Sequence, residues 1–170
     1  MPEIDLNSYR SKADEALGSG GTVTLASGAS APLGTYENPK IIYVNGTLKL
    51  AGNLTGVGVI VASKGIEITG NVTYGASGSA WALLTAGSLT MAGTTQVQGS
   101  IYCHNATGTA EFIGHGTPNV LGCVVADVVT FTGDYTVEWD GGPAQIWDLP
   151  GSVVSHGPPV IETVAWKKHH

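Results

Sequence analysis

Charged residues are scarce in this sequence. Asp, Glu, Lys and Arg together make up 12% of its 170 residues, about half of the ~25% that is usual in globular domains. Only seven residues are Lys or Arg, and the formal net charge is −6. The chain therefore lacks the basic stripe that a row of phosphates requires, which argues against nucleic-acid binding and against attraction to anionic membrane surfaces.

Long hydrophobic runs and cysteines are also scarce. No apolar stretch approaches the ~20 residues of a transmembrane helix. The two cysteines form no CxxC pattern, which excludes a zinc ribbon or a thioredoxin-type site. Glycine is abundant instead, with 25 residues, but it keeps no collagen-like period of three. Because Thr and Val are also frequent, we expect a folded, β-rich single domain and not a disordered chain.

A repeat of about twenty residues begins at Pro39. Five successive segments each contain a β-rich run, a turn, a short alternating strand and a glycine. The repeated glycines are Gly52, Gly70, Gly93, Gly114 and Gly133, so their spacing stays close to the length of one repeat. Such a period is typical of a β-solenoid, in which each coil buries its inner face by stacking on the next. The sequence therefore predicts an all-β fold, a single-stranded parallel β-helix of about five to six coils.

The alternation within each repeat predicts which side chains face inward. Apolar residues stand at i and i+2 immediately before the repeated glycines, so we expect them to stack as columns in the core. These pairs are Leu48 and Leu50, Ile66 and Ile68, Leu89 and Met91, and Val129 and Phe131.

The two ends of the stack are expected to be capped, because open sheet edges invite other chains to pair. Residues 5–17 have helical periodicity and end at Gly18, which predicts a capping helix. We divide the chain into a helix and first partial coil (1–38), the coils (39–140), a C-terminal cap with a closing strand at 160–166 (141–168), and a purification-tag remnant (169–170). On this view a natural segment preceded Met1.

Several segments resemble a known family. The stretches IDLNSYRSKAD, VNGTLKLAGNLTG, SKGIEITGNVT and the closing VAWKK are similar to the C-terminal domain of PilX-type, type IV pilus-associated bacterial surface proteins. The match departs from that family at Lys167-Lys168, where such domains often carry an Arg-Glu pair. The resemblance implies a right-handed β-helix located in the periplasm or outside the cell, anchored by a preceding membrane helix. It implies neither a catalytic residue nor a cofactor.

The two cysteines, Cys103 and Cys123, are separated by one repeat. They would therefore lie on adjacent coils, with strands ~4.8 Å apart. A disulfide is geometrically possible at that separation. A slip in register would place one thiol inside and the other outside, and two separate, buried thiols are the alternative that we favour.

A group of carboxylates near the end of the repeats is the candidate ligand surface. It comprises Asp127, Asp134, Glu138 and Asp140. Parallel β-helix enzymes that act on polysaccharides use paired carboxylates, so by fold analogy this is where an active site would lie. Solvated turn charges are the simpler interpretation, because one short acidic cluster is usually surface.

The histidines give no sign of a metal site. His104, His115 and His156 do not fall at ligand spacing, so we expect surface or turn positions and no bound metal. A Cys103–His104 dyad is disfavoured because neighbouring strand residues face opposite sides. The Asn-x-Thr triplets, which include Asn105-Ala106-Thr107, are interpreted as turn chemistry of the repeat.

The leading hypothesis is a non-catalytic structural or adhesive surface module. It would be monomeric and part of a type IV pilus or type II secretion-like assembly, with other components of that assembly or a surface glycan as partner. Three alternatives remain open: a carbohydrate-binding or carbohydrate-active protein, a bactofilin-like polymer, and an ice-binding solenoid. The last would use outward threonines such as Thr47, Thr69, Thr90 and Thr130.

Overall fold

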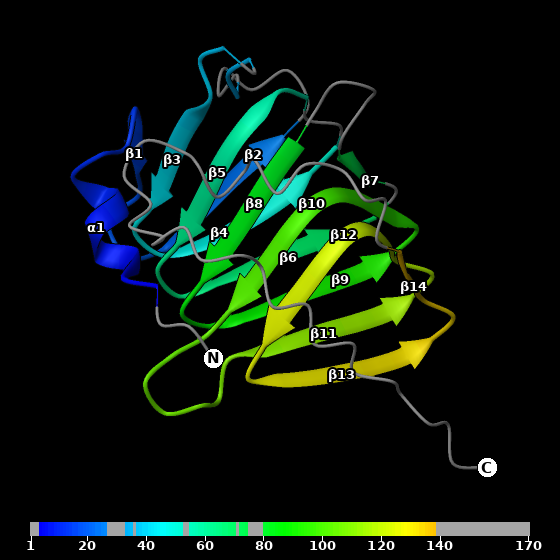
Figure 1. Cartoon of the computed structure of the whole chain (residues 1–170). Helices are drawn as coiled ribbons and strands as arrows, with labels where there is room; N and C mark the ends of the chain where they lie inside the picture. The colour runs from blue at the N-terminus through cyan, green and yellow to red at the C-terminus, as the bar shows by residue number, and fades with distance from the viewer. Residues whose placement is uncertain are drawn as a thin grey trace, which may run out of the picture.

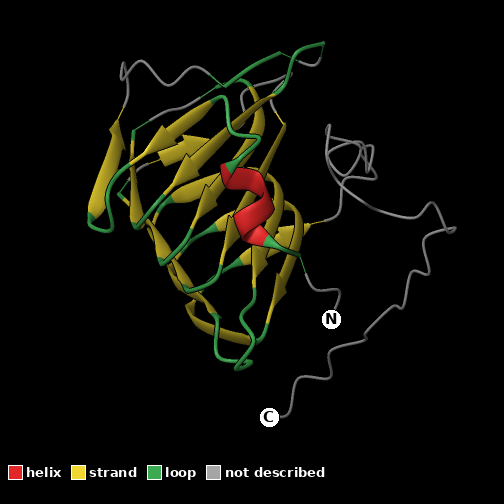
Figure 2. Ribbon diagram, turned by 90° about the vertical axis from the view of Figure 1, so that its left-hand side faces the viewer, coloured by secondary structure: helices red, strands yellow, loops and turns green. Residues whose placement is uncertain are grey.

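The computed structural model describes residues 4–26, 33–35, 37–52, 55–70, 72–74 and 80–138, with backbone only at 72–74 and 80–81. Within these ranges there is one helix, α1 (Leu6–Arg10), and the remaining elements are strands in two sheets (Figures 1 and 2). In the same ranges no helix is long and apolar enough to cross a bilayer.

The larger sheet, sheet A, contains eight strands, and the smaller, sheet B, contains six. The strands of sheet A are β1 (Glu15–Leu17), β3 (Lys40–Val44), β5 (Val57–Ala62), β7 (Val72–Tyr74), β8 (Ala80–Thr85), β10 (Thr95–Cys103), β12 (Asn119–Ala126) and β14 (Thr136–Glu138). The strands of sheet B are β2 (Thr22–Ala26), β4 (Thr47–Ala51), β6 (Gly65–Thr69), β9 (Ser88–Gly93), β11 (Glu111–Gly116) and β13 (Val128–Gly133).

All pairings between these strands are parallel, and from β2 to β6 and again from β8 to β14 the chain alternates between the two sheets. The number of residues along the chain between two paired positions varies. It is smaller for Asn119 and Thr136 than for Glu15 and Ile42. Figure 1 shows the two sets of strands running across each other in separate layers. The predictions of a mainly β fold and of parallel strand pairing are confirmed in the described residues.

The core lies between the two sheets and consists of aliphatic columns. Sheet B contributes Leu48, Ile66 and Leu89 in one column and Leu50, Ile68 and Met91 in the next, each at most 1% exposed. Sheet A contributes Ile42, Ile60, Leu83 and Ile101, which are also buried. Each such side chain stabilises the fold by about 1.5–3 kcal/mol through the removal of apolar surface from water. These inward assignments confirm three of the four predicted pairs.

The fourth predicted pair, Val129 and Phe131, is only partly inside. Val129 is 40% exposed, while Phe131 packs against the core edge. Both belong to β13, which is the outermost strand of sheet B in the described part of the chain. With a neighbouring strand on one side only, an inward position there is incompletely covered.

One of the repeated glycines was misassigned. The glycine in register with Gly93 and Gly133 is Gly116, not Gly114. Gly116 has φ +85°, as the strand-ending Gly93 has φ +84°, a conformation that glycine adopts at low cost. Gly114 instead occupies the inward position of Met91.

The outer face of sheet A carries a second apolar cluster, against which the N-terminal segment packs. It consists of Ile41, Tyr43, Val59, Val61, Ala82, Leu84 and Tyr102, with Ile4, Leu6, Tyr9 and Ala13 packed against it. Figure 2 shows the helix lying alongside the strands. The N-terminal helix therefore covers a side of sheet A, whereas the sequence predicted a cap.

The predicted helix is also shorter than expected. Of residues 5–17, only Leu6–Arg10 are helical, and Glu15–Leu17 form a strand that pairs with β3. The Asp14 N–H donates to the Ile41 carbonyl (2.9 Å), and the Ile41 N–H donates to Asp14 Oδ2 (2.8 Å). Pairing with the sheet outweighs the helical periodicity of residues 11–17. The predicted C-terminal cap, closing strand and tag remnant (141–170) lie outside the described residues.

Candidate functional site

A row of five residues follows the carboxyl ends of successive sheet A strands. Asn45, Ser63, Ala86, His104 and Asp127 each come directly after the last residue of β3, β5, β8, β10 or β12. Backbone hydrogen bonds continue the ladder into this row, for example from His104 N–H to the Thr85 carbonyl (3.1 Å) and from Asp127 N–H to the Cys103 carbonyl (3.1 Å). Residues distant in sequence are thereby stacked at one edge of sheet A, which we call the corner row.

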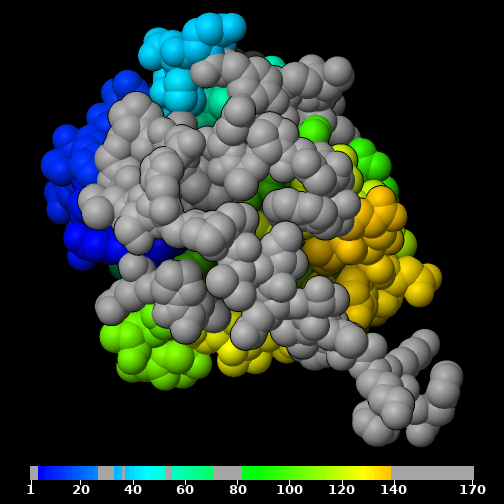
Figure 3. All heavy atoms as spheres, viewed as in Figure 1, coloured from blue at the N-terminus to red at the C-terminus, as the bar shows by residue number. Residues whose placement is uncertain are grey.

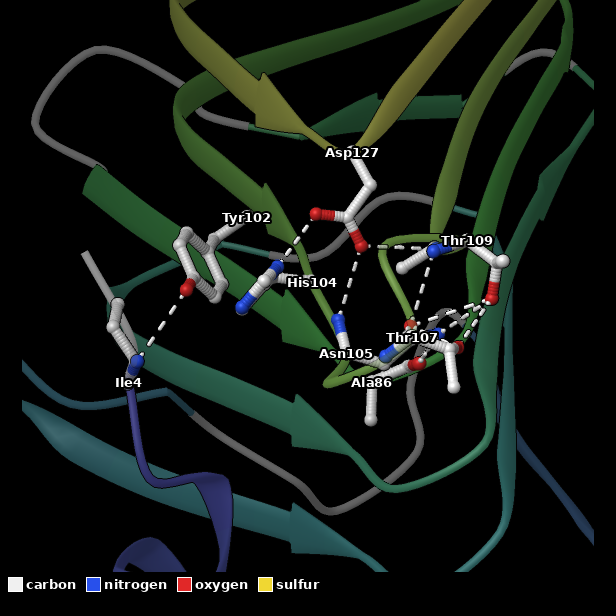
Figure 4. Close-up of polar contacts among 9 residues, drawn as sticks. Ile4, Ala86, Tyr102, His104, Asn105, Thr107, Thr109 and Asp127 are labelled. Carbon is white, nitrogen blue, oxygen red and sulfur yellow. Dashed lines mark hydrogen bonds and ion pairs between the residues drawn. The ribbon is translucent and has the colours of Figure 1, made fainter. Parts of the chain in front are cut away.

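His104 and Asp127 are joined within the corner row. His104 Nδ1 lies 2.5 Å from Asp127 Oδ1, and the side chains are 20% and 7% exposed (Figure 4). The other oxygen, Oδ2, accepts hydrogen bonds from the N–H groups of Asn105 and Ala110, both at 3.1 Å. The hydrogen bond from His104, supported by these two N–H groups, lowers the pKa of Asp127.

The two N–H groups that Asp127 binds are near the ends of an enlarged loop. Residues 104–110 connect β10 to β11, whereas two residues suffice between β3 and β4, β5 and β6, and β8 and β9. Within the loop, Asn105 Nδ2 donates to the Ala86 carbonyl (3.0 Å), and its Oδ1 accepts from the N–H groups of Thr107 and Thr109. Figure 3 shows the loop protruding at the lower left of the molecule. Asp127 and Asn105 therefore hold an insertion in one conformation.

A pocket of about 610 Å³ opens between the corner row and the N-terminal segment. The N-terminal segment is held there by a hydrogen bond from the Ile4 N–H to the Tyr102 hydroxyl (3.3 Å). Two corner-row residues with small side chains, Ser63 and Ala86, line the pocket together with His104. The lining residues are Ile4, Asp5, Leu6, Asn7, Tyr43, Ser63, Ala86, His104, Asn105 and Ala106.

Among the described residues, no serine or cysteine side chain is hydrogen-bonded to His104 or Asp127. Ser63 and His104 are two strands apart in the corner row, which places them on the order of 10 Å apart. Ser63 Oγ accepts a hydrogen bond from Gly46 N–H (2.9 Å). Cys103 faces the core, and burial raises the pKa of its thiol to about 12. The arrangement therefore lacks the nucleophile–base contact of a hydrolytic triad.

The two cysteines are both free thiols. Cys103 is paired in register with Ala126, and Cys123 with Ser100, so paired residues of β10 and β12 are farther apart along the chain than the two cysteines. Ser100 and Cys103 are an odd number of positions apart on β10, and side chains at such positions face opposite sides of a strand. The possible disulfide between Cys103 and Cys123 is therefore not formed, because the two side chains lie on opposite faces of sheet A.

The predicted acidic ligand surface is dispersed. Asp127 and Asp134 flank opposite ends of β13, about 20 Å apart for a strand of that length. Glu138 pairs with Leu121, well before Asp127 on the adjoining strand. Asp134 and Glu138 are exposed, and Asp140 lies outside the described residues. Asp127 therefore forms no close carboxylate pair with Asp134 or Glu138 of the kind that glycoside hydrolysis requires.

The remaining sequence candidates do not converge on a site either. His115 is exposed and contacts the Thr132 hydroxyl, and His156 lies outside the described part. Among described residues no group of three His, Cys, Asp or Glu side chains is placed to hold a metal. Of the four outward threonines named from the sequence, only Thr90 and Thr130 share a column, and Ile113 lies between them. On the other side of Thr90 the same column continues through Glu67 and Lys49.

No known protein family, curated protein or solved structure matches this chain. The interpretation of the site therefore depends on its own geometry. Sequence reasoning considered His104 and Asp127 separately and missed that they form a pair. The signal that could have joined them is that both directly follow a strand, and that these two strands are neighbours in the same sheet.

Proposed function

We propose that this protein is a non-catalytic structural and adhesive surface module built on a right-handed parallel β-helix. The observation that carries the proposal is the alternation of parallel strands between two sheets, in which each strand pairs with the strand of the following coil. A chain that leaves a sheet, crosses to another layer and returns in parallel makes a crossover connection, and such connections are right-handed in about 98% of cases. Stacked coils of this kind form a rigid scaffold for display.

The absence of catalysis is supported by the engagement of two reactive groups in the described part, Asp127 and Cys103. Both oxygens of Asp127 are occupied by hydrogen bonds that fix the loop 104–110, and Cys103 is buried in the core. A general acid or base needs a free position toward its substrate. These side chains stabilise the scaffold, and the surface is left for recognition.

The assignment to a pilus or secretion assembly outside the cytoplasm rests on the resemblance to PilX-type domains. The segments that carry it and are described include α1 and the coils around β4 and β6. In such a setting the module would present its surface to other assembly components or to a surface glycan. A membrane anchor preceding this chain belongs to the same proposal.

Two measurements test the proposal. Deletion of the gene should reduce surface pili or secretion, and the purified chain should bind ligands on a glycan array. The adhesive function would be contradicted if the gene deletion changed neither pilus number nor secretion and the purified chain bound no glycan. Turnover of a polysaccharide by the purified chain would contradict the absence of catalysis.

A polymer-forming module is the second candidate, because of one observation. In the described residues, the exposed large apolar side chains all lie at the β13–β14 end of the stack: Val128, Val129, Tyr135 and Val137, each 40–49% exposed. The N-terminal helix lies on the side of sheet A and so does not oppose end-to-end stacking. Light scattering at increasing protein concentration distinguishes a monomer from a growing polymer.

A further inference from the structure

The pocket beside His104 has the chemistry of a small-molecule site. We propose that it binds one or two units of an uncharged saccharide, with Nε2 of His104 accepting a hydrogen bond from a sugar hydroxyl. This proposal rests on the adhesive function above and names its ligand class and site.

The orientation of the imidazole comes from Asp127. A carboxylate accepts a hydrogen bond from Nδ1–H, so the neutral ring presents Nε2 as an acceptor. Figure 4 shows Nε2 on the side of the ring away from Asp127. Because the side chain of Asp127 is 7% exposed and also binds two backbone N–H groups, the ring is held in place before any ligand arrives, which reduces the entropy lost on binding.

The lining favours a neutral, hydroxyl-rich ligand. None of the ten lining residues is Lys or Arg, and Asp5 is an acid, so the lining offers an anionic ligand no lysine or arginine as a counter-charge. The lining combines polar residues, Asn7, Ser63 and Asn105, with the apolar residues Ile4 and Leu6 and the ring of Tyr43. Sugars present both hydroxyls and C–H faces, which match such a mixed wall.

The size of the pocket agrees with this ligand class. Its volume of about 610 Å³ falls within the ~300–1,000 Å³ typical of small-molecule sites. Ala86 lines the pocket and lies between two other lining residues of the corner row, Ser63 and His104. A larger side chain at residue 86 should fill the site without removing a polar partner, since the hydrogen bond from Asn105 goes to the backbone carbonyl of Ala86.

The test compares three variants of the full chain on an array of neutral and acidic glycans, followed by titration calorimetry with the best neutral oligosaccharide. Ala86→Leu and His104→Ala should each weaken binding at least about tenfold, which corresponds to ~1.4 kcal/mol. The matched control is Ala92→Leu on β9 in sheet B, which does not line the pocket. Circular dichroism spectra and thermal melts of each variant show whether it is folded.

The outcomes separate this proposal from the proposed function. If folded Ala86→Leu binds the same neutral glycan as strongly as the parent chain, the pocket is not the site, although the adhesive function stands. If only sialylated or sulfated glycans bind, the ligand class is wrong. If the parent chain binds no glycan, this proposal fails, and a loss of pili on gene deletion would then still support the structural role.

Discussion

Cys103 and Cys123 belong to neighbouring strands of sheet A but face opposite sides of it. The Cys103 side chain is fully buried in the core, whereas Cys123 is half-buried and its Sγ lies 3.3 Å from Ser100 Oγ. The register that pairs Ser100 with Cys123 and Cys103 with Ala126 enforces this separation. It also gives the two thiols very different access to solvent.

This difference predicts selective thiol labelling. Burial raises the pKa of Cys103 to about 12, so its reactive thiolate is scarce at pH 8. Ellman's reagent should therefore label one thiol per folded chain and two in urea. Cys123→Ser should abolish labelling of the folded chain, and Cys103→Ala should leave it intact. Complete protection of both thiols without reductant, relieved by reduction, would mean that the disulfide forms after all.

The carboxylate of Asp127 predicts an acid-sensitive contribution to stability. Its pKa is lowered in the folded state by the hydrogen bond from His104 and by two backbone N–H groups, relative to about 3.9 in unfolded chains. A lowered pKa stabilises the fold above the unfolded value, and that contribution is lost as pH falls through the folded pKa. Asp127→Asn should therefore lower the free energy of unfolding at pH 7, with a deficit that shrinks below about pH 4.

Urea unfolding at pH 7, 5 and 3 measures this deficit. The control is Asp134→Asn, which removes an exposed carboxylate at the other end of β13 and should change stability by no more than about 0.5 kcal/mol at any of these pH values. A deficit for Asp127→Asn that is equal at pH 7 and pH 3 would show that its charge is not the stabilising feature.

The repeat and the inward columns could be predicted because they depend on local alternation. The spacing of the apolar residues along each strand is enough to predict that Leu48, Ile66 and Met91 face the core. The end of the N-terminal helix could not be predicted in this way, because the pairing of residues 15–17 with β3 is a tertiary contact. The pocket could not be predicted either, because it depends on the insertion 105–109. An even repeat predicts Gly114 at the position that Gly116 occupies, and it does not predict the contact between His104 and Asp127.

The inward columns predict an alternating sensitivity along β9. Met91 is fully buried, whereas its neighbour Thr90 lies on the outer face. Met91→Ala should destabilise the protein by about 2–5 kcal/mol, because it removes buried surface and leaves a cavity. Thr90→Ala should cost less than about 1 kcal/mol. Equal losses in urea unfolding would contradict the assignment of the two faces.

Alanine substitutions at Gly114 and Gly116 should respond differently to a second substitution, Phe131→Leu. An added Cβ at Gly114 would lie 2.8 Å from the Phe131 ring, and its other nearby atoms are also side-chain atoms. An added Cβ at Gly116 would lie 3.0 Å from the Gly93 carbonyl, and its φ of +85° is strained for any L-residue, at a cost of about 1–2 kcal/mol. Gly114→Ala should therefore be partly rescued by Phe131→Leu, which removes the ring atoms.

Gly116→Ala should not be rescued by the same change, because its cost lies in the backbone. A double-mutant cycle measured by urea unfolding compares the two cases: we expect a coupling energy of at least about 0.5 kcal/mol for residues 114 and 131 and near additivity for residues 116 and 131. Phe131→Leu alone supplies the reference. Coupling at residue 116 as large as at residue 114 would contradict the placement of Gly116 as the strand-ending glycine and of Gly114 as the inward position facing Phe131.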